Sequence, residues 1–302
     1  MMAQTLSTMK QGCKLKSVRA FDVILAFFLS VLGFIVLYPF YNVLVVSFSS
    51  ISSQAAHTPY LWFWDFDLSG YKTIMNDKSF FFSLRNTLFV TIVGTTINML
   101  LSTTTAYVLS KKRLPGRNFL LGLVLIPMLF NGGLIPTYLV VKSYGLIDSI
   151  WAMILPCAIS SYYVLIMKNY FAAIPQSLEE AAIIDGANDI QVLLRVILPI
   201  SKPFTMTFFL FYAVERWNEW WNAYLYIAEK SLAPLQIYLR EILVNMNNQL
   251  ALQAQMATGG TKIQSQSIQM ATIIITALPI ICVYPFVQKY FVKGVMVGSV
   301  KE

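Results

Sequence analysis

Charged residues are scarce in this sequence, and the scarcity excludes most soluble proteins. They make up 12% of the 302 residues, while hydrophobic residues make up 57%. A soluble domain carries about 25% charged residues, so water is not the main solvent of this chain. The composition therefore predicts an integral membrane protein.

Residues that build common catalytic centres are also few. The single histidine, His57, leaves nothing from which to build a histidine-rich metal site. The three cysteines are an odd number, and Cys157 and Cys282 lie inside apolar runs, which disfavours a disulfide framework. The sequence has no GxxxxGK(S/T) loop, no GxGxxG after a strand and no HExxH helix. We expect no catalytic residue, metal or cofactor on the chain itself, which also disfavours an integral membrane enzyme.

Long apolar runs are what the sequence has instead. A membrane-spanning helix needs roughly 20 mostly apolar residues, and six segments qualify. The first is too long for the core of a signal peptide and lacks a convincing cleavage site, so we expect it to be retained. The prediction is an all-α protein with six transmembrane helices, at about 22–47, 84–110, 118–141, 150–170, 203–227 and 267–288.

The basic residues predict the orientation of these spans. Fourteen Lys and Arg residues flank one side and seven flank the other. Because the side richer in Lys and Arg faces the cytoplasm, we expect both termini there. The net charge of +8 reflects this bias and contact with anionic lipid rather than a nucleic-acid partner. The predicted layout is a cytoplasmic basic tail (1–20), a six-helix domain (21–302), external stretches at 48–82 and 229–266, and a cytoplasmic loop at 171–202.

Two spans carry residues that could serve a transport pathway. Asn131 and Gly132 interrupt the third span between two prolines, and broken helices either line transport cavities or mark a packing kink. The fifth span contains ionisable residues and tryptophans, which suit a sugar site. Its two glutamates, Glu215 and Glu219, are four residues apart, so a continuous helix would place them on one face. The alternative is an internal ion pair beside an outer tryptophan belt. The candidates in this span are Glu215, Arg216, Trp217, Glu219 and Trp220.

Residues 178–200 form a polar corner between the fourth and fifth spans. Ser177 and Glu180 fit a capping box, so a helix should start near Leu178 and end at Gly186. Asn188 or Asp189 can cap a second helix, which Pro199 should stop.

The charge of this loop is unusual for its side of the membrane. Residues 171–202 carry four acidic residues against Arg195 and Lys202. We expect the loop to dock on a basic surface of a partner. The alternative, a linker lying on the membrane, is disfavoured because anionic lipid would repel it.

The loop resembles that of the permease subunits of bacterial ABC importers. The family pattern reads EAA, a glycine, and I-x-L-P, which stand here at 180–182, Gly186 and 197–199. Leu193 departs from the phenylalanine of many members but remains apolar. The resemblance covers about residues 80–228, and the segment FNGGLIPTYLVVKSYGLIDS is similar to the maltose-type branch that serves complex oligosaccharides.

The resemblance implies a type I importer permease fold in the bacterial cytoplasmic (inner) membrane. It implies a second permease, two ATPases that bind ATP and Mg, an extracytoplasmic binding protein, and an oligosaccharide cargo such as alginate or pectin fragments. A non-sugar cargo and an ion-driven secondary transporter stay open as alternatives. The residues it implies for coupling to the ATPase are Glu179, Glu180, Ala181, Ala182, Asp185, Gly186, Ala187, Leu198 and Pro199.

Overall fold

The computed structural model describes residues 20–50, 62, 65–244 and 262–299. Within these ranges the chain is helical, and the one isolated β-bridge joins Ser49 to Phe66. The predicted basic tail lies outside the described residues, except for Ala20. Parts of both predicted external stretches lie outside them as well.

Three helices are long and apolar enough to cross a membrane unbroken. They are α1 (Ala20–Ser47), α4 (Lys78–Ser110) and α14 (Lys262–Ser299), whose qualifying part is Gln266–Val283. These helices contain the first, second and sixth predicted spans. The number of candidate spans rises to six only if each of three bent helix pairs is one span.

The other three predicted spans are not single straight helices; the sequence predicted an interruption in the third span but named none in the fourth or fifth. The axis bends by 119° between α5 and α6, by 47° before α7, and by 91° between residues 189–200 and 202–226. The shorter elements are α3 (Ser69–Asn76), α5 (Arg117–Leu129), α6 (Leu134–Ser143), η1 (Ile150–Met153), η2 (Leu155–Cys157), α7 (Ser161–Ala172), α8 (Gln176–Ile184), α9 (Asp189–Val192), η3 (Leu193–Ile197), α10 (Leu198–Ile200), α11 (Lys202–Trp217), α12 (Trp221–Tyr226) and η4 (Lys230–Leu232), and residues 235–244 are also helical.

Local chemistry explains the sharpest of these breaks. Gly133 has φ +86°, a conformation that L-residues with side chains rarely adopt. Asn131 Oδ1 accepts a hydrogen bond from the Gly133 amide at 2.9 Å, which closes a turn between the two helices. The 13 residues of α5 extend only about 20 Å at 1.5 Å per residue. This helix is therefore shorter than the roughly 30 Å hydrocarbon core of a bilayer.

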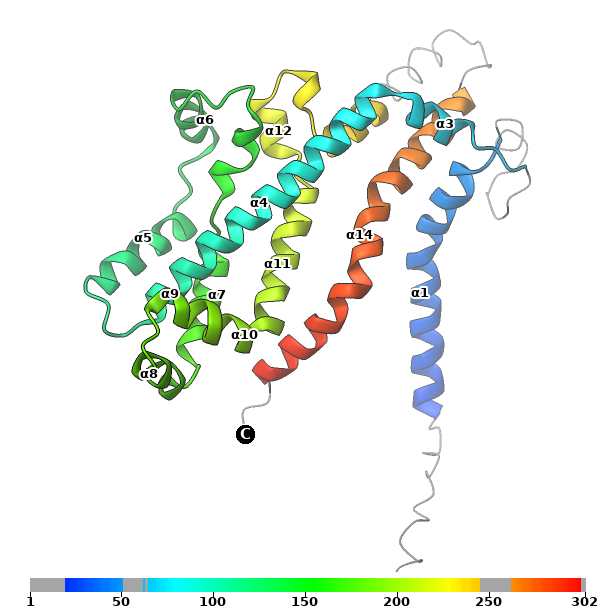
Figure 1. The fold of residues 1–302 in the computed structure, drawn as a ribbon. Helices are drawn as coiled ribbons and strands as arrows, with labels where there is room; N and C mark the ends of the chain where they lie inside the picture. Colours follow the sequence, from blue (N-terminus) through cyan, green and yellow to red (C-terminus); the bar gives the residue numbers. More distant parts are fainter. Residues whose placement is uncertain (1–19, 51–61, 63–64, 245–261, 300–302) are drawn as a thin grey trace, which may run out of the picture.

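Helix α4 is the centre of the fold. Helices α7 and α11 pack along it, and α14 packs between α11 and α1 (Figure 1). The buried face of α4 carries many polar and small side chains. Asn86 Nδ2 donates to the Ser231 carbonyl at 2.8 Å, and Ser102 Oγ lies 2.6 Å from Tyr212 Oη. Such hydrogen bonds hold membrane helices together, because the lipid offers no competing partner.

The ends of the elements fall at two opposite ends of the molecule. Figure 1 shows α8, α9 and α10 at the end where α1 begins and α14 finishes, while α3, α6 and α12 lie at the other end. The loop of α8–α10, the start of α1 and the end of α14 therefore lie at the same end of the molecule, as the distribution of Lys and Arg predicts. Which end faces the cytoplasm stays a prediction.

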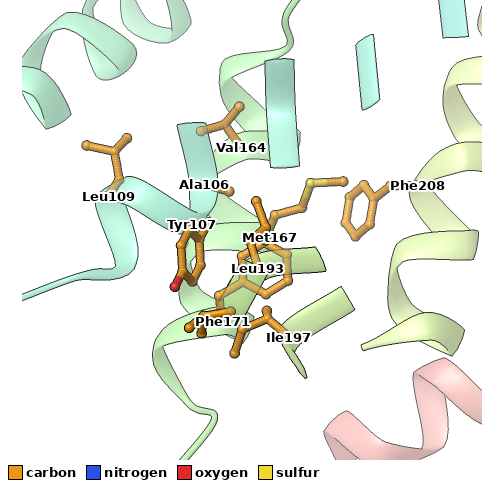
Figure 2. Close-up of a cluster of buried hydrophobic side chains, with 10 residues drawn as sticks. Ala106, Tyr107, Leu109, Val164, Met167, Phe171, Leu193, Ile197 and Phe208 are labelled. Carbon is orange, nitrogen blue, oxygen red and sulfur yellow. The ribbon is translucent and has the colours of Figure 1, made fainter. Parts of the chain in front are cut away.

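A buried apolar cluster ties the corner of α8–α10 to the long helices. It joins Tyr107 and Leu109 of α4, Met167 and Phe171 of α7, and Ile197 of η3. Figure 2 shows Tyr107, Met167, Phe171 and Ile197 close together, with Leu109 of α4 and Phe208 of α11 at opposite edges of the cluster. Burial of a large apolar side chain stabilises by roughly 1.5–3 kcal/mol. The corner is therefore packed on the bundle rather than attached as an independent loop.

Candidate functional site

The loop corner (residues 176–200) begins with a helix whose start differs from the prediction. Helix α8 begins at Gln176 after Pro175, and no side chain caps it. The predicted capping box of Ser177 and Glu180 is therefore wrong. Pro175 occupies the N-cap position with φ −57° and ψ 127°, so Ser177 lies inside the first turn of α8 and cannot act as its cap.

The glycine corner follows the prediction. Helix α8 ends at Ile184, and Gly186 adopts φ +86°. Its amide donates to the Ile183 carbonyl at 3.0 Å, and the Ala187 amide donates to the Ala182 carbonyl at 2.9 Å. These bonds satisfy carbonyls at the helix end, and a residue with a Cβ would be strained at Gly186.

The second helix of the corner has the capping box. Asn188 Oδ1 accepts from the Gln191 amide at 2.9 Å, and Gln191 Oε1 accepts from the Asn188 amide at 3.0 Å. A π-helical turn, η3, follows at Leu193–Ile197, and α10 ends at Ile200, one residue after Pro199. The predicted cap at Asn188 is confirmed, whereas the π turn has no counterpart in the sequence prediction.

The expected coupling residues divide into an outward set and an inward set. The inward set packs against the buried cluster of Figure 2 and consists of Ala182, Ala187 and Leu198. The outward set is exposed and consists of Glu180, Ala181, Asp185, Gly186 and Pro199. A Cβ added at Gly186 would meet no atom within 4 Å. The corner therefore presents a small-residue, acidic surface that another protein can approach closely.

Glu179 faces inward and makes an ion pair that the sequence analysis missed. Its carboxylate accepts from the ammonium of Lys111, which directly follows α4 and lies 4.0 Å from the centre of the Tyr107 ring. Burial lowers the pKa of Lys111, but its interactions with Glu179 and Tyr107 outweigh this effect and raise the pKa above its ordinary value. The ammonium therefore stays charged at neutral pH, and the pair joins α4 to α8.

A hollow of about 510 Å³ opens beside this ion pair. Lys111, Lys112 and Arg113 line one part of it, and Glu179 and Asp189 line another. The hollow has mixed charge and lies between the end of α4 and the loop corner. Motion of the corner would have to reshape it.

The residues predicted for a substrate cavity in the fifth span lie in different environments. Helix α11 ends at Trp217, so Glu215 and Glu219 do not share one helical face, and that prediction is wrong. Glu215 is exposed and accepts a hydrogen bond from Tyr163 Oη at 2.5 Å. Glu219 is 8% exposed and accepts from the amide and the side chain of Asn222, both at 3.0 Å.

Arg216 is an internal residue. It is 5% exposed, its Nη1 donates to the Met153 carbonyl at 2.7 Å, and it lies 3.4 Å from Glu219 Oε2. Gly94 of α4 leaves the space that its side chain fills, because a Cβ there would lie 2.9 Å from Arg216 Cδ. The arrangement agrees with the internal ion pair rather than with a carboxylate-binding arginine.

The two tryptophans also differ. Trp217 is 6% exposed and packs among Ile74, Phe80 and Leu235, and its Nε1 donates to the Thr276 carbonyl at 3.2 Å. Trp220 follows the end of α11 and is 43% exposed. Burial therefore makes Trp217 part of the packing, whereas Trp220 can meet a ligand or lipid.

Asn131 and Gly132 lie in the exposed turn between α5 and α6. A Cβ at Gly132 would meet nothing within 4 Å, so close packing does not explain this glycine. The structure confirms a break at this point. It does not bring Asn131 together with the residues of α11.

The described residues contain no cluster of potential metal ligands. Across 20–50, 65–244 and 262–299, no group of three or more His, Cys, Asp or Glu residues lies close enough to hold a metal ion. The polar groups of the two sites instead bind one another and the backbone.

The sequence analysis missed three features of these sites: the ion pair of Lys111, the capping-box partner of Asn188, and the position of Arg240. Lys111 was counted only as a basic flank, and nothing in its spacing from Glu179 predicts contact across 68 positions. Asn188 and Gln191 carry the spacing of a capping box, so pattern alone could have found that box. Arg240, which lies over the rings of Trp220 and Tyr224, had no signal beyond its charge.

Comparisons with known proteins find relatives over nearly the whole length of the chain. No family model matches the sequence. Protein LplC of Bacillus subtilis (strain 168) is 43% identical over 95% of this chain and 96% of its own length. The polygalacturonan/rhamnogalacturonan transport system permease protein YtcP of the same strain is 41% identical over 94% of this chain and 99% of its own.

A solved structure is similar in both fold and sequence. It is a chain of a bacterial ABC transporter involved in the import of the acidic polysaccharide alginate. The TM-score is 0.82 at 34% sequence identity, covering 91% of this chain and 98% of that one. The likeness extends over nearly the whole length of both chains.

Proposed function

The chain belongs to the permease subunits of bacterial ABC transporters, and on that premise we propose that it forms half of the transmembrane pathway of an oligosaccharide importer. In this scheme the chain hydrolyses no ATP itself. ATP and Mg bind to two partner ATPases, and the loop corner transmits their motion to the spans. The observation that carries the proposal is the loop corner: an exposed acidic surface at Glu180–Gly186 on a base that packs into the bundle.

The route from the corner to the spans supports this role. The buried cluster links α9–η3 to α4, α7 and α11, and the Lys111–Glu179 pair adds a polar tie between α4 and α8. Packed interiors transmit displacement because they have few voids into which side chains can move. A partner that moves the loop corner would therefore move the ends of the central helices.

The cargo we propose is an oligosaccharide containing uronate. Support comes from YtcP, whose name describes transport of polygalacturonan and rhamnogalacturonan, and from the alginate importer, because both cargoes are acidic polysaccharides. Arg216 does not hold the carboxylate of such a cargo in this structure, because its partners are internal. The candidates that remain exposed are Asn131, Gly132, Glu215 and Trp220.

The wider assembly follows from the family. We propose a second, homologous permease, two ATPases and an extracytoplasmic binding protein as partners, and a multi-pass location in the bacterial cytoplasmic membrane. Residues 21–302 would form the six-span domain, with the loop at 171–202 and both termini in the cytoplasm, and stretches 48–82 and 229–266 outside. An ABC permease for a non-sugar cargo and an ion-driven transporter are the alternatives that the test must separate.

ATPase activity of the purified complex tests the proposal. The chain is co-purified with its partner permease and ATPases, placed in liposomes with its binding protein, and supplied with acidic and neutral oligosaccharides. We expect stimulation by acidic oligosaccharides. Glu180→Lys should abolish stimulation while the protein still reaches the membrane, because it reverses the charge of the docking surface.

Two outcomes separate the alternatives, and one variant serves as a control. Stimulation by peptides or amino acids, but not by sugars, would assign a non-sugar cargo. If no ATPase co-purifies and none restores transport, the ion-driven reading replaces the importer. Asp22→Asn, a charge change in α1 away from the loop corner, serves as the matched control and should leave stimulation unchanged.

A further inference from the structure

An exposed aromatic surface with a cation above it lies at the end of the molecule opposite the loop corner. Trp220 and Tyr224, before and within α12, have ring centroids 6.5 Å apart. Arg240, from the helical residues 235–244, places its Cζ 4.3 Å from the Tyr224 centroid and 5.9 Å from the Trp220 centroid. Tyr224 is 53% exposed and Trp220 is 43% exposed. We name these three residues the aromatic platform.

The platform borders a groove of about 310 Å³. Tyr224, Arg240 and Glu241 line it together with apolar residues that include Ile227 and Pro234. One helical turn before Arg240, Gln236 Nε2 donates to Asn218 Oδ1 at 3.2 Å. Ligand sites combine an apolar wall with a few placed polar groups, and this groove has both.

The charge of Arg240 is not neutralised within the described residues. The ion pairs there join Lys111 to Glu179 and Arg216 to Glu219. Glu241 follows Arg240 in the sequence and lines the same groove, but it makes no ion pair with Arg240. The sequence after Glu241 contains no Asp or Glu until Glu302, so the segment at 245–261 supplies no acidic residue either. An exposed arginine that stacks on aromatic rings keeps its planar edge available for a carboxylate.

A uronate has the two features that this surface matches. One face of its pyranose ring consists largely of C–H groups, which pack on an aromatic ring, and its carboxylate accepts two parallel hydrogen bonds from a guanidinium. Arg240 lies closer to the Tyr224 ring than to the Trp220 ring, so the guanidinium leaves room beside Trp220, and both residues stay exposed, Tyr224 at 53% and Trp220 at 43%. Glu241, at the groove wall, can accept hydrogen bonds from sugar hydroxyls.

We propose that the aromatic platform is a receiving subsite for an acidic sugar unit, with Trp220 stacking on the ring and Arg240 pairing with the carboxylate. The subsite deepens and rests on the proposed function. It differs from the cavity predicted from the sequence, because Arg240 replaces Arg216 as the cationic residue. Tryptophans that only anchor a protein at the membrane surface need no arginine over their rings, whereas Arg240 lies over both rings of the platform.

Fluorescence of the purified complex tests the subsite without the transport cycle. Tryptophan emission is titrated with trigalacturonate and with its neutral methyl ester, in the absence of the binding protein. We expect trigalacturonate to change the emission, and Trp220→Phe to remove much of that change. Arg240→Gln should weaken trigalacturonate binding by about tenfold, the loss expected for one charge-assisted pair, and leave the weaker binding of the ester unchanged.

Arg85→Gln is the matched control. Arg85 is another exposed arginine over an aromatic ring, 5.8 Å from the Phe82 centroid. The Arg85→Gln variant should bind trigalacturonate as the wild type does. Equal affinity in Arg240→Gln, Arg85→Gln and the wild type would overturn the subsite and leave the platform as a membrane-surface anchor only.

Uptake of labelled trigalacturonate by cells separates the two proposals. If cells import it and the wild-type complex shows no change in emission, the subsite is overturned and the proposed function stands. If cells do not import it and the complex does not bind it, both the subsite and the acidic cargo are overturned. Salt should weaken binding to the wild type more than to Arg240→Gln, because screening acts on the charge pair.

Discussion

At the scale of single residues, Arg216 shows how one buried charge can decide between two functional readings. Its guanidinium holds the Met153 carbonyl and pairs with Glu219, so it links η1 to the turn after α11. Breaking a buried pair by removing one partner leaves an uncompensated charge, which costs far more than losing a surface pair. Arg216 therefore belongs to the packing of the bundle.

Gly94→Ala tests that assignment. The new Cβ would lie 2.9 Å from Arg216 Cδ, and the guanidinium cannot move without leaving Met153. We expect the free energy of unfolding to fall by about 1–3 kcal/mol, as for other overpacked sites, and the melting temperature of the purified complex to fall with it. Gly122→Ala in α5 is the control, because its Cβ would meet nothing within 4 Å. A melting temperature for Gly94→Ala equal to that of Gly122→Ala would contradict the close approach.

The same environment predicts how Arg216→Gln affects transport. The uptake rates of acidic and of neutral oligosaccharides should fall to the same degree, because the substitution disturbs packing rather than a contact with a carboxylate. Uptake rates of a matched acidic and esterified pair measure this. A selective loss of acidic cargo would return Arg216 to the substrate pathway and contradict the internal ion pair.

At the scale of elements, the loop corner depends on how each short helix begins. The four residues of α9 are too few to form a stable helix alone, because helix nucleation is unfavourable. Its capping box and the apolar contacts of Val192 and Leu193 hold it in place. Helix α8 needs no such cap, because Pro175 sets the entry of the chain.

Asn188→Ala and Ser177→Ala should therefore differ. Removing the Asn188 cap should cost about 1 kcal/mol of local stability, seen as faster hydrogen exchange in residues 189–192 and weaker ATPase stimulation. Ser177→Ala should change neither, although the sequence pattern assigns the cap of α8 to Ser177. Equal effects of the two substitutions would mean that the observed caps do not control the corner.

At the scale of the whole molecule, the two ends differ in charge and content. The loop corner and the end of α4, with its Lys111–Arg113 cluster, lie at one end, and the aromatic platform lies at the other (Figure 1). A polar corner and a sugar-receiving surface on opposite faces would suit an importer, which must bind ATPases on one side and receive cargo on the other.

Single cysteines report which end faces the cytoplasm. In a variant without Cys13, Cys157 and Cys282, we introduce Ser177→Cys in α8 or Ser231→Cys in η4, both exposed. A membrane-impermeant maleimide added to intact cells should label the cysteine at 231 and reach the one at 177 only after permeabilisation. The reverse pattern would overturn the orientation inferred from the basic residues.

The helical class, the glycine corner at Gly186, a cap at Asn188 or Asp189 and the family pattern could all be predicted from the sequence. These features depend on composition or on neighbours within a few positions, which a single sequence displays. It also located the interruption at Asn131–Gly133, because glycine between prolines disfavours a continuous helix.

The contacts that the charged residues make could be seen only in the folded chain. Lys111 finds Glu179 across 68 positions, Arg216 bonds to Met153 across 63, and Arg240 lies over rings from another helix. The end of α11 at Trp217 separates two glutamates that helical spacing would place together. Such contacts depend on how helices cross and where they stop. Those features arise from packing of the whole bundle, and local sequence does not encode them.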